Sequence, residues 1–493
     1  MNLSLISLEL CVTALGLLVL VADLWLPADR RRFLGYLVAA ALGVLFLNSF
    51  TGHCSCALIG QTGFGGMFIQ DALSVFFKRF FLVAAVLVLV MAVEFSDHIA
   101  TGIAEYYSLI VIALAGMLFA ASANDFTMLF VSIELITITF YVLTSFQRAR
   151  LGSLEAGVKY LILGALASAF MVFGIALVWG ISGQFNFSGL ATQLSQHPEI
   201  AANKLFLIGV LFVLAGLGFK IAAFPFQIWA PDVYQGAPTP TTAFLAVGSK
   251  AAGFVLLLRF LFSAIPEVAA RWQNVLIVLS ALTILYGNLC ALPQTNLKRL
   301  LGYSSIAHAG YLLLGIAAMA GAGKTSADGA AALLYYLSGY VFTVIAAFIV
   351  IAAVLRHLDS EEISGLAGLS HRSPLLAATM ALAMVSLAGI PPLAGFFGKF
   401  LLLKAVIEQG AANHGYYCLA FTALAGVVIS IYYYFGVIRE IYWSENKADS
   451  GPIPVSIPAR LALGVCIAGM FYLGLFPGAM VSAAEAAAKI LKF

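Results

Sequence analysis

The sequence predicts an all-α polytopic membrane protein with about 14 transmembrane helices. Of its 493 residues, 62% are hydrophobic and only 10% are charged, whereas soluble domains carry about 25% charged residues. The mean hydropathy is +1.03. Apolar runs long enough to cross a bilayer, about 20 residues each, recur from one end of the chain to the other. A chain with so few charges cannot cover its own surface in water, which excludes the soluble classes.

The first run has no basic segment before it, so we expect a retained helix and not a cleaved signal. Two of the runs hold prolines near a lysine: Pro225 lies in the seventh, and Pro391 and Pro392 lie in the twelfth. Because proline removes a helix hydrogen bond, we expect helices 7 and 12 to be broken. The expected spans are 3–26, 33–50, 72–95, 104–122, 124–146, 155–181, 204–229, 239–262, 272–292, 300–319, 329–355, 375–408, 415–442 and 458–488.

The distribution of basic residues predicts the orientation. Loops on the cytoplasmic side of a membrane protein carry an excess of lysine and arginine. With both termini outside, the cytoplasmic connections hold Arg30, Arg31, Arg32, Arg148, Arg150, Lys298, Arg299, Arg356, Arg372, Arg439, Lys447 and Arg460, and the outer ones hold only Lys204, Arg271, Lys324, Lys489 and Lys492. This asymmetry favours fourteen spans with both termini outside. Lys78 and Arg79, near the outer end of span 3, run against the rule.

Other binding classes find little support. The net charge of +3 comes from scattered basic residues and not from a basic stripe, so nucleic-acid binding is not predicted. Cys54 and Cys56 lack a second ligand pair, so a structural metal is not expected. The segment Gly323-Lys324-Thr325 resembles the end of a phosphate-binding loop, but the full motif needs glycine where Ala318 stands. Nucleotide binding is therefore excluded.

Four charged residues stand out at mid-depth in the predicted spans and are the main functional candidates. They are Glu134 in span 5, Lys220 in span 7, Lys250 in span 8 and Lys399 in span 12. A charge at the bilayer centre costs roughly 2.5–3.5 kcal/mol on the insertion scale, and such residues usually line ion or proton paths. The alternative is that each belongs to a buried structural ion pair.

An acid and three lysines at this depth suit proton transfer. Burial disfavours the charged form of a side chain, so each group can change its charge state when a neighbour does. Lysine does so readily and arginine does not. Lys220 and Lys399 also lie close to the expected helix breaks, and in transporters such breaks lie beside the translocation site.

Further candidates have two readings each. His308 in span 10 is either a proton relay or a hydrogen-bonded core histidine. Glu155 and Lys159, one turn apart at the start of span 6, form either a surface pair or the entrance to a path. Lys404 is either an exit residue or a snorkelling lysine. Four acids near the ends of spans are expected at the membrane interface: Glu9, Asp23, Glu94 and Asp125.

The spans divide into four predicted units. In spans 4–8 and again in spans 9–13, the second helix carries a titratable residue, Glu134 or His308, and the fourth carries a lysine beside a proline break. Five is an odd number, so the second block must be inverted in the membrane. We therefore predict helices 1–3 at 1–103, a first five-helix repeat at 104–262, an inverted second repeat at 272–443, and helix 14 at 458–493.

Three stretches resemble the antiporter-like membrane subunits of complex I, the proton-pumping NADH–quinone oxidoreductase, and within them the N type. The stretches are 229–240 (WAPDVYQGAPTP), 296–311 (NLKRLLGYSSIAHAGY) and 387–400 (LAGIPPLAGFFGKF). Together with the layout of spans, the resemblance covers nearly the whole chain. It implies a multi-pass subunit of a proton-translocating enzyme in the bacterial inner membrane, surrounded by lipids and by other membrane subunits, including its antiporter-like sisters.

The resemblance also implies roles for individual residues. Glu134 would be the acid of the span 5 site and would pair with Lys220, Lys250 would be the central relay, and Lys399 would exchange protons with the outside. Lys159 matches a family lysine in span 6. The family binds no redox cofactor on this subunit, because partner subunits carry the flavin, the iron–sulfur clusters and the quinone site.

Three alternatives remain at this point. The first is an independent cation/proton antiporter or a subunit of one, since such proteins resemble this family. The second is a structural scaffold subunit, in which neutralising Lys220 or Lys399 leaves proton transfer intact. The third keeps the fold but uses a different electron donor.

Overall fold

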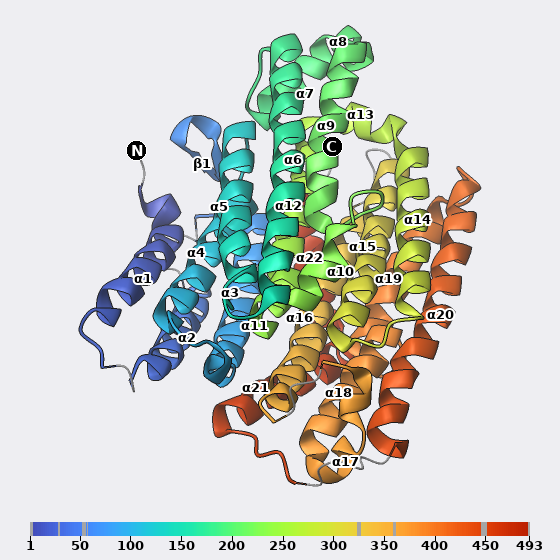
Figure 1. The fold of residues 1–493 in the computed structure, drawn as a ribbon. Coiled ribbons are helices and arrows are strands. Elements are labelled where there is room, and N and C mark those ends of the chain that lie inside the picture. Colours follow the sequence, from blue (N-terminus) through green and yellow to red (C-terminus); the bar gives the residue numbers. More distant parts are fainter. Residues whose placement is uncertain are drawn as a thin grey trace.

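The structure is a computed structural model that describes residues 3–27, 30–51, 56, 58–322, 327–357, 361–444 and 451–491. Cys54 and the segment Gly323-Lys324-Thr325 lie outside the described residues. The long helices run roughly alongside one another, with α1 (Ser7–Asp23) and α2 (Arg31–Asn48) at one edge of the bundle. At the opposite edge stand α14 (Gln273–Ala291) and α20 (Gly415–Trp443) (Figure 1).

The predicted all-helical membrane architecture is confirmed. In the described part of the chain, thirteen helices are long and apolar enough to cross a membrane. The remaining predicted span, 375–408, consists of two shorter helices, as expected from its prolines. The first half of the chain continues with α3 (Ala72–Glu94), α4 (Ile103–Ala121), α5 (Phe126–Thr144), α6 (Leu151–Ser182), α9 (Lys204–Ile221), α10 (Trp229–Gly236), α11 (Thr239–Phe244) and α12 (Lys250–Arg259). The second half adds α13 (Pro266–Arg271), α15 (Leu297–Ala322), α16 (Asp328–Leu355), α17 (Leu369–Arg372), α18 (Pro374–Ala388), α19 (Ala394–Gln409), α21 (Ile457–Leu475) and α22 (Gly478–Ala488).

Several connections contain structure that the sequence did not predict, including α13 and α17. Between spans 2 and 3, strands β1 (Gln61–Gly63) and β2 (Phe68–Gln70) form an antiparallel hairpin. Between spans 6 and 7, α7 (Phe187–Gln196) and α8 (Pro198–Ala202) extend beyond one end of the bundle (Figure 1). These short elements lie in the connections and leave the membrane helices unchanged.

Both expected helix breaks are present. Helix α9 ends at Ile221, where Ala222 adopts a left-handed conformation with φ of 57°, and the chain passes Pro225 before α10 begins at Trp229. Helix α18 ends at Ala388, followed by Gly389 with φ of 85° and by the two prolines, and α19 begins at Ala394. Freed backbone groups at membrane depth persist only where protein or water satisfies them. Each break is therefore a place where polar groups are expected to gather.

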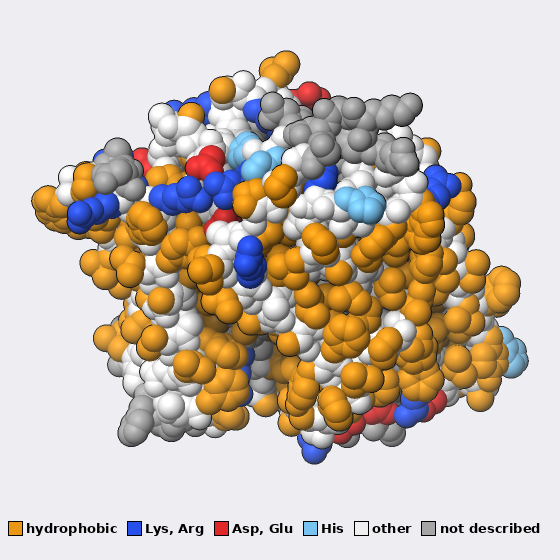
Figure 2. Space-filling view, turned by 90° about the horizontal axis from the view of Figure 1, so that it is seen from below, with side chains coloured by type: hydrophobic (Ala, Val, Ile, Leu, Met, Phe, Trp, Pro, Cys, Tyr) orange, Lys and Arg blue, Asp and Glu red, His pale blue; other side chains and the backbone are white. Residues whose placement is uncertain are grey.

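Burial separates lipid-facing helices from central ones. In the apolar stretch of the span Thr239–Ala264, which contains α11 and α12, every residue is buried, and in that of α15 94% of the residues are buried. The share of buried residues is only 28% in α6 and 33% in α20. Broad hydrophobic areas cover much of the surface in Figure 2. The central helices thus offer an interior for polar side chains, and the outer ones shield it from lipid.

A charged cluster ties the connection after α16 to both halves of the chain. Glu361 forms ion pairs with Arg150, which precedes α6, at 2.6 Å and with the buried Lys298 of α15 at 3.0 Å. Burial raises the pKa of Glu361, but the charges of Lys298 and Arg150 outweigh it and hold the pKa below its ordinary value. The carboxylate therefore stays ionised at neutral pH and keeps this connection in place.

Candidate functional site: a row of buried lysines

Lys220 and Glu134 lie near each other but are not paired in this structure. Lys220, in the last turn of α9, is 3% exposed, and its Nζ donates to Thr137 Oγ1 on α5 at 2.8 Å. Glu134 lies one helical turn before Thr137 and accepts a hydrogen bond from Ser168 on α6 at 2.5 Å. The pair expected from the resemblance is therefore open here, with the ammonium one turn away from the carboxylate on the same face of α5.

Gly253 brings Lys220 close to the helix of Lys250. A Cβ atom at Gly253 would lie 2.7 Å from Ile221 Cγ2 and 3.2 Å from Lys220 Cγ, so only glycine leaves room for the lysine stem. Gly253 follows Lys250 by three residues on α12, and residues at this spacing share a helix face. The two lysines therefore belong to neighbouring turns of one interface.

Lys250 reaches across to α15. It is 3% exposed, and its Nζ donates to the backbone oxygen of Ser305 at 2.5 Å and also contacts Ser305 Oγ. The same hydroxyl is hydrogen-bonded to Tyr234 at 2.9 Å and to Tyr340 at 3.3 Å. A π-helical turn, Leu245–Ser249, directly precedes Lys250, and such turns are frequent at functional sites.

His308 continues the row on the same helix. It lies three residues after Ser305 and is 2% exposed. Its Nδ1 is hydrogen-bonded to Tyr336 of α16, and its Nε2 lies 3.0 Å from the hydroxyl of Tyr434 on α20. Because both ring nitrogens face tyrosine hydroxyls, the geometry suits either a proton relay or a fully hydrogen-bonded core histidine.

Lys399 lies on α19, the second half of the broken helix 12, and reaches the end of the first half, α18. It is 5% exposed, and its Nζ donates to the carbonyls of Leu387 at 2.7 Å and Ala388 at 3.1 Å, which end α18. These carbonyls have no partner within their own helix, and the negative end of the helix dipole favours a cation. Gly389 is required beside it, because a Cβ would lie 2.9 Å from Lys399 Cδ and because its φ is positive.

A small cavity lies between His308 and the end of α18. Its volume is about 10 Å³, and its lining includes His308, Tyr336 and Leu387, whose carbonyl accepts from Lys399. This is close to the space that one water molecule occupies. The row thus runs from Glu134 through three lysines and a histidine, across helices that are far apart in the sequence.

Lys159 lies apart from this row at the surface. It pairs with Glu155 at 2.7 Å, as its spacing predicts, and also with Asp232 at 2.8 Å. Asp232 in turn pairs with Arg299 at 2.6 Å. The Lys159 side chain is 43% exposed, so this cluster belongs to the rim of the bundle.

Three buried cations outside the row, Lys78, Arg259 and Lys298, have carboxylate partners, whereas the buried Arg372 donates to the Gly451 carbonyl. Lys78 pairs with Glu9 at 2.6 Å, both with fully buried side chains, and Arg259 pairs with Asp71 at 2.8 Å, with 3% and 1% exposed. Glu9, which was expected at the membrane interface, is enclosed within the protein, where α1 packs against α4. Lys404, by contrast, is exposed and lies 3.7 Å from Glu408.

The three lysines of the row differ in this respect from Lys78, Arg259 and Lys298. Among the described residues, no carboxylate oxygen lies within 4.0 Å of the ammonium of Lys220, Lys250 or Lys399. Each donates only to hydroxyl or carbonyl oxygens. The alternative that they belong to structural ion pairs therefore finds no support in this conformation.

Sequence reasoning missed the neutral groups that link the row. Thr137, Ser168, Tyr336 and Tyr434 contact its charged members but attract no notice singly, because hydroxyl residues are common in apolar helices. Thr137 could have been found from the sequence, because it lies three residues after Glu134 and therefore shares its helix face. In the part of the chain that is described, no three His, Cys, Asp or Glu side chains cluster as a metal site would require.

Comparison with known proteins gives a consistent result. Residues 123–428 match the family model described as NADH:quinone oxidoreductase/Mrp antiporter, TM. The chain is 41% identical over 494 residues to NADH-quinone oxidoreductase subunit N of Heliobacterium modesticaldum, with 100% of each chain covered. It is 32% identical to a chain in the structure of respiratory complex I from Thermus thermophilus with bound aureothin, covering 97% of this chain and 99% of that one, with a TM-score of 0.77. A chain of the Mrp complex from Dietzia sp. shares the fold alone, with 20% identity, coverage of 100% and 98%, and a TM-score of 0.83.

Proposed function

Because this chain belongs to the family of NADH-quinone oxidoreductase subunit N, we propose that it carries protons across the membrane through its row of buried lysines. One observation supports this most strongly: Lys220, Lys250 and Lys399 are buried without any carboxylate partner among the described residues. A buried cation that lacks an anion gains little from staying charged. Such an amine can release its proton when a nearby charge changes and take one up again later.

The proposed path begins with the open pair on α5. Quinone reduction elsewhere in the complex changes the charge near Glu134, which draws the Lys220 ammonium from Thr137 toward the carboxylate. Closing this pair strengthens the hold of Lys220 on its proton, and opening it weakens that hold. A proton released by Lys220 passes to Lys250 when that amine is neutral.

The second half of the path leads from Lys250 to Lys399. The Ser305 hydroxyl and His308 lie on one face of α15, and the small cavity beside Tyr336 has space for about one water between His308 and Leu387. A proton would cross this cavity to Lys399 and leave from there. Lys159 and its partner Asp232 at the rim would supply protons at the other end.

The division into repeats and the orientation are also proposals. The two helix breaks with their lysines, at Ile221 and at Ala388, support a first repeat at 104–262 and an inverted second repeat at 272–443. The excess of basic residues in alternate connections supports a chain in the bacterial inner membrane with both termini outside. The flavin, the iron–sulfur clusters and the quinone site would lie on partner subunits, beside sister antiporter-like subunits in the membrane.

Affinity purification tests this assignment against an independent antiporter. We expect the tagged full-length chain, extracted from its native membranes in mild detergent, to bring down NADH:quinone oxidoreductase activity. An equally tagged unrelated multi-pass protein serves as control. Recovery of the chain alone, or with antiporter subunits and no such activity, would contradict the proposal.

A further inference from the structure

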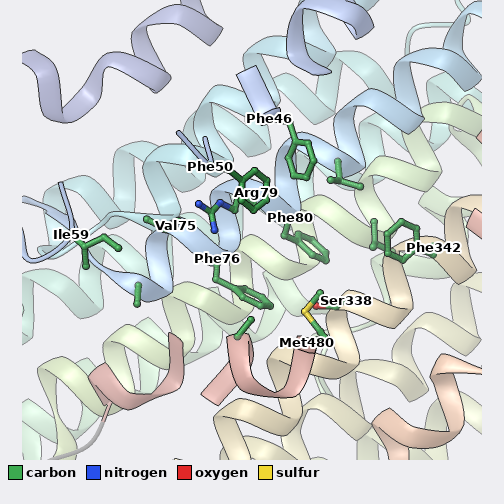
Figure 3. Close-up of a pocket in the computed structure, with 14 residues that line it drawn as sticks. Phe46, Phe50, Ile59, Val75, Phe76, Arg79, Phe80, Ser338, Phe342 and Met480 are labelled. Atoms are coloured by element: carbon green, nitrogen blue, oxygen red, sulfur yellow. The ribbon is translucent and has the colours of Figure 1, made fainter. Parts of the chain in front are cut away.

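An apolar groove lies outside the lysine row, between α2, α3, α16 and α22. Its volume is about 370 Å³, within the range of about 300–1,000 Å³ typical of ligand sites. Figure 3 shows its lining, which includes Phe46, Phe76, Phe80, Phe342 and Met480. The lining is almost entirely apolar, so a hydrocarbon chain would find a matching surface here.

Among the described residues that line this groove, Arg79 of α3 is the one charged side chain. Its Nη2 donates to the Ser49 carbonyl at 2.7 Å, its Nε lies 3.2 Å from Ser49 Oγ, and its guanidinium stacks 3.9 Å from the centre of the Phe50 ring. A guanidinium has five N–H donors, and these contacts use two of them. Among the described residues, no carboxylate lies within 4.0 Å of Arg79, whereas its neighbour Lys78 has Glu9.

The position of the guanidinium indicates which ligand it suits. Ser49 directly follows the last residue of α2, so the cation lies at the level where this membrane helix ends. At that level a bilayer changes from hydrocarbon to head groups. A cation with donors that bind no other described residue lies at this boundary, above a groove lined by rings and aliphatic chains. This arrangement matches the phosphate and acyl chain of a phospholipid.

We propose that this groove binds an anionic phospholipid, with its phosphate at Arg79 and an acyl chain along the rings of α2, α3 and α16. Capping the end of α2 accounts for the two donors that reach Ser49 and leaves the others for phosphate oxygens, which guanidinium groups bind well. A helix of a neighbouring subunit would suit the apolar lining but would leave the cation without an anion. The proposal does not depend on the proton path.

The test measures the binding of two lipids to the purified assembly that contains the chain. Phosphatidylglycerol and phosphatidylcholine with identical acyl chains are titrated into detergent-solubilised protein after delipidation, and bound lipid is counted by native mass spectrometry. We expect tighter binding of phosphatidylglycerol. A basic residue near a membrane surface contributes about 1 kcal/mol toward anionic lipid, so Arg79→Gln is expected to weaken that binding about fivefold and Arg79→Lys to retain it.

A second variant tests the acyl-chain part of the site. Ala483 lines the groove and is exposed, so Ala483→Trp fills the groove without disturbing the core and should weaken binding of both lipids. The controls are Ser482→Trp on the same helix and Arg460→Gln at another exposed position. Equal affinity for the two lipids, unchanged binding in Arg79→Gln, or a cross-link that places a partner helix in the groove would overturn the proposal.

Discussion

The Lys250→Met variant is expected to assemble normally and to lose proton pumping. Methionine is as long and flexible as lysine, so it fills the same buried space between α12 and Ser305. It cannot hold a proton, so a proton that moves from Lys220 toward His308 meets an apolar gap. A charge in such a place costs about 2.5–3.5 kcal/mol, which corresponds to a rate roughly 100-fold lower.

The measurement for Lys250→Met is NADH-driven acidification of inverted membrane vesicles, with the amount of assembled complex scored alongside. Lys404→Met is the matched control, because Lys404 is 60% exposed and lies outside the row. We expect Lys404→Met to pump normally. Pumping at the wild-type rate in Lys250→Met would remove this lysine from the path.

The Arg259→Leu variant is expected to lower stability more than other single changes outside the row. The Arg259 guanidinium binds both carboxylate oxygens of Asp71, at 2.8 and 2.9 Å, and the Ala121 carbonyl at 2.8 Å. Removing one partner of a buried pair leaves an uncompensated charge, at a cost of about 3–5 kcal/mol. Asp71 also caps α3 through Ser74, so we expect the start of that helix to loosen.

Thermal unfolding of the purified protein in detergent measures this effect. Arg271→Leu is the control, since Arg271 is an exposed arginine and the described residues give it no ion pair. The double variant Arg259→Leu with Asp71→Asn removes the stranded charge and is expected to recover part of the loss. A melting temperature for Arg259→Leu equal to that of Arg271→Leu would show that the pair contributes little.

The fold could be predicted closely because lipid imposes simple requirements. Every span must be apolar and helical, so hydropathy located the helices, and the prolines at 225, 391 and 392 located both breaks. The β1–β2 hairpin and the short helices α7 and α8 were not predicted. They lie in connections, where neither hydropathy nor a clear periodicity applies.

The site could be predicted only in its charged members. Lys220, Lys250 and Lys399 stand out because a charge in an apolar span is costly, but their partners are ordinary hydroxyl residues and backbone carbonyls. Which helices meet is a property of packing. The Glu9–Lys78 pair joins residues 69 positions apart, and nothing near either residue in the sequence indicates the other.

The open state of the Glu134–Lys220 pair is the feature on which the proposed mechanism depends most. The resemblance implied a formed pair, whereas the structure has Lys220 on Thr137 and Glu134 on Ser168. In the proposed mechanism, movement of this ammonium between Thr137 and Glu134 gives the path a switch that a permanent ion pair would lack. A substitution of Lys220 therefore tests the proposed mechanism most directly.

The most direct test is the ratio of protons pumped to NADH oxidised in vesicles that carry Lys220→Ala, with the assembled complex quantified in the same membranes. We predict that the complex assembles and that the ratio falls far below the wild-type value, because the first amine of the row is missing. An unchanged ratio with normal turnover would contradict a proton path through this chain and favour a scaffold role.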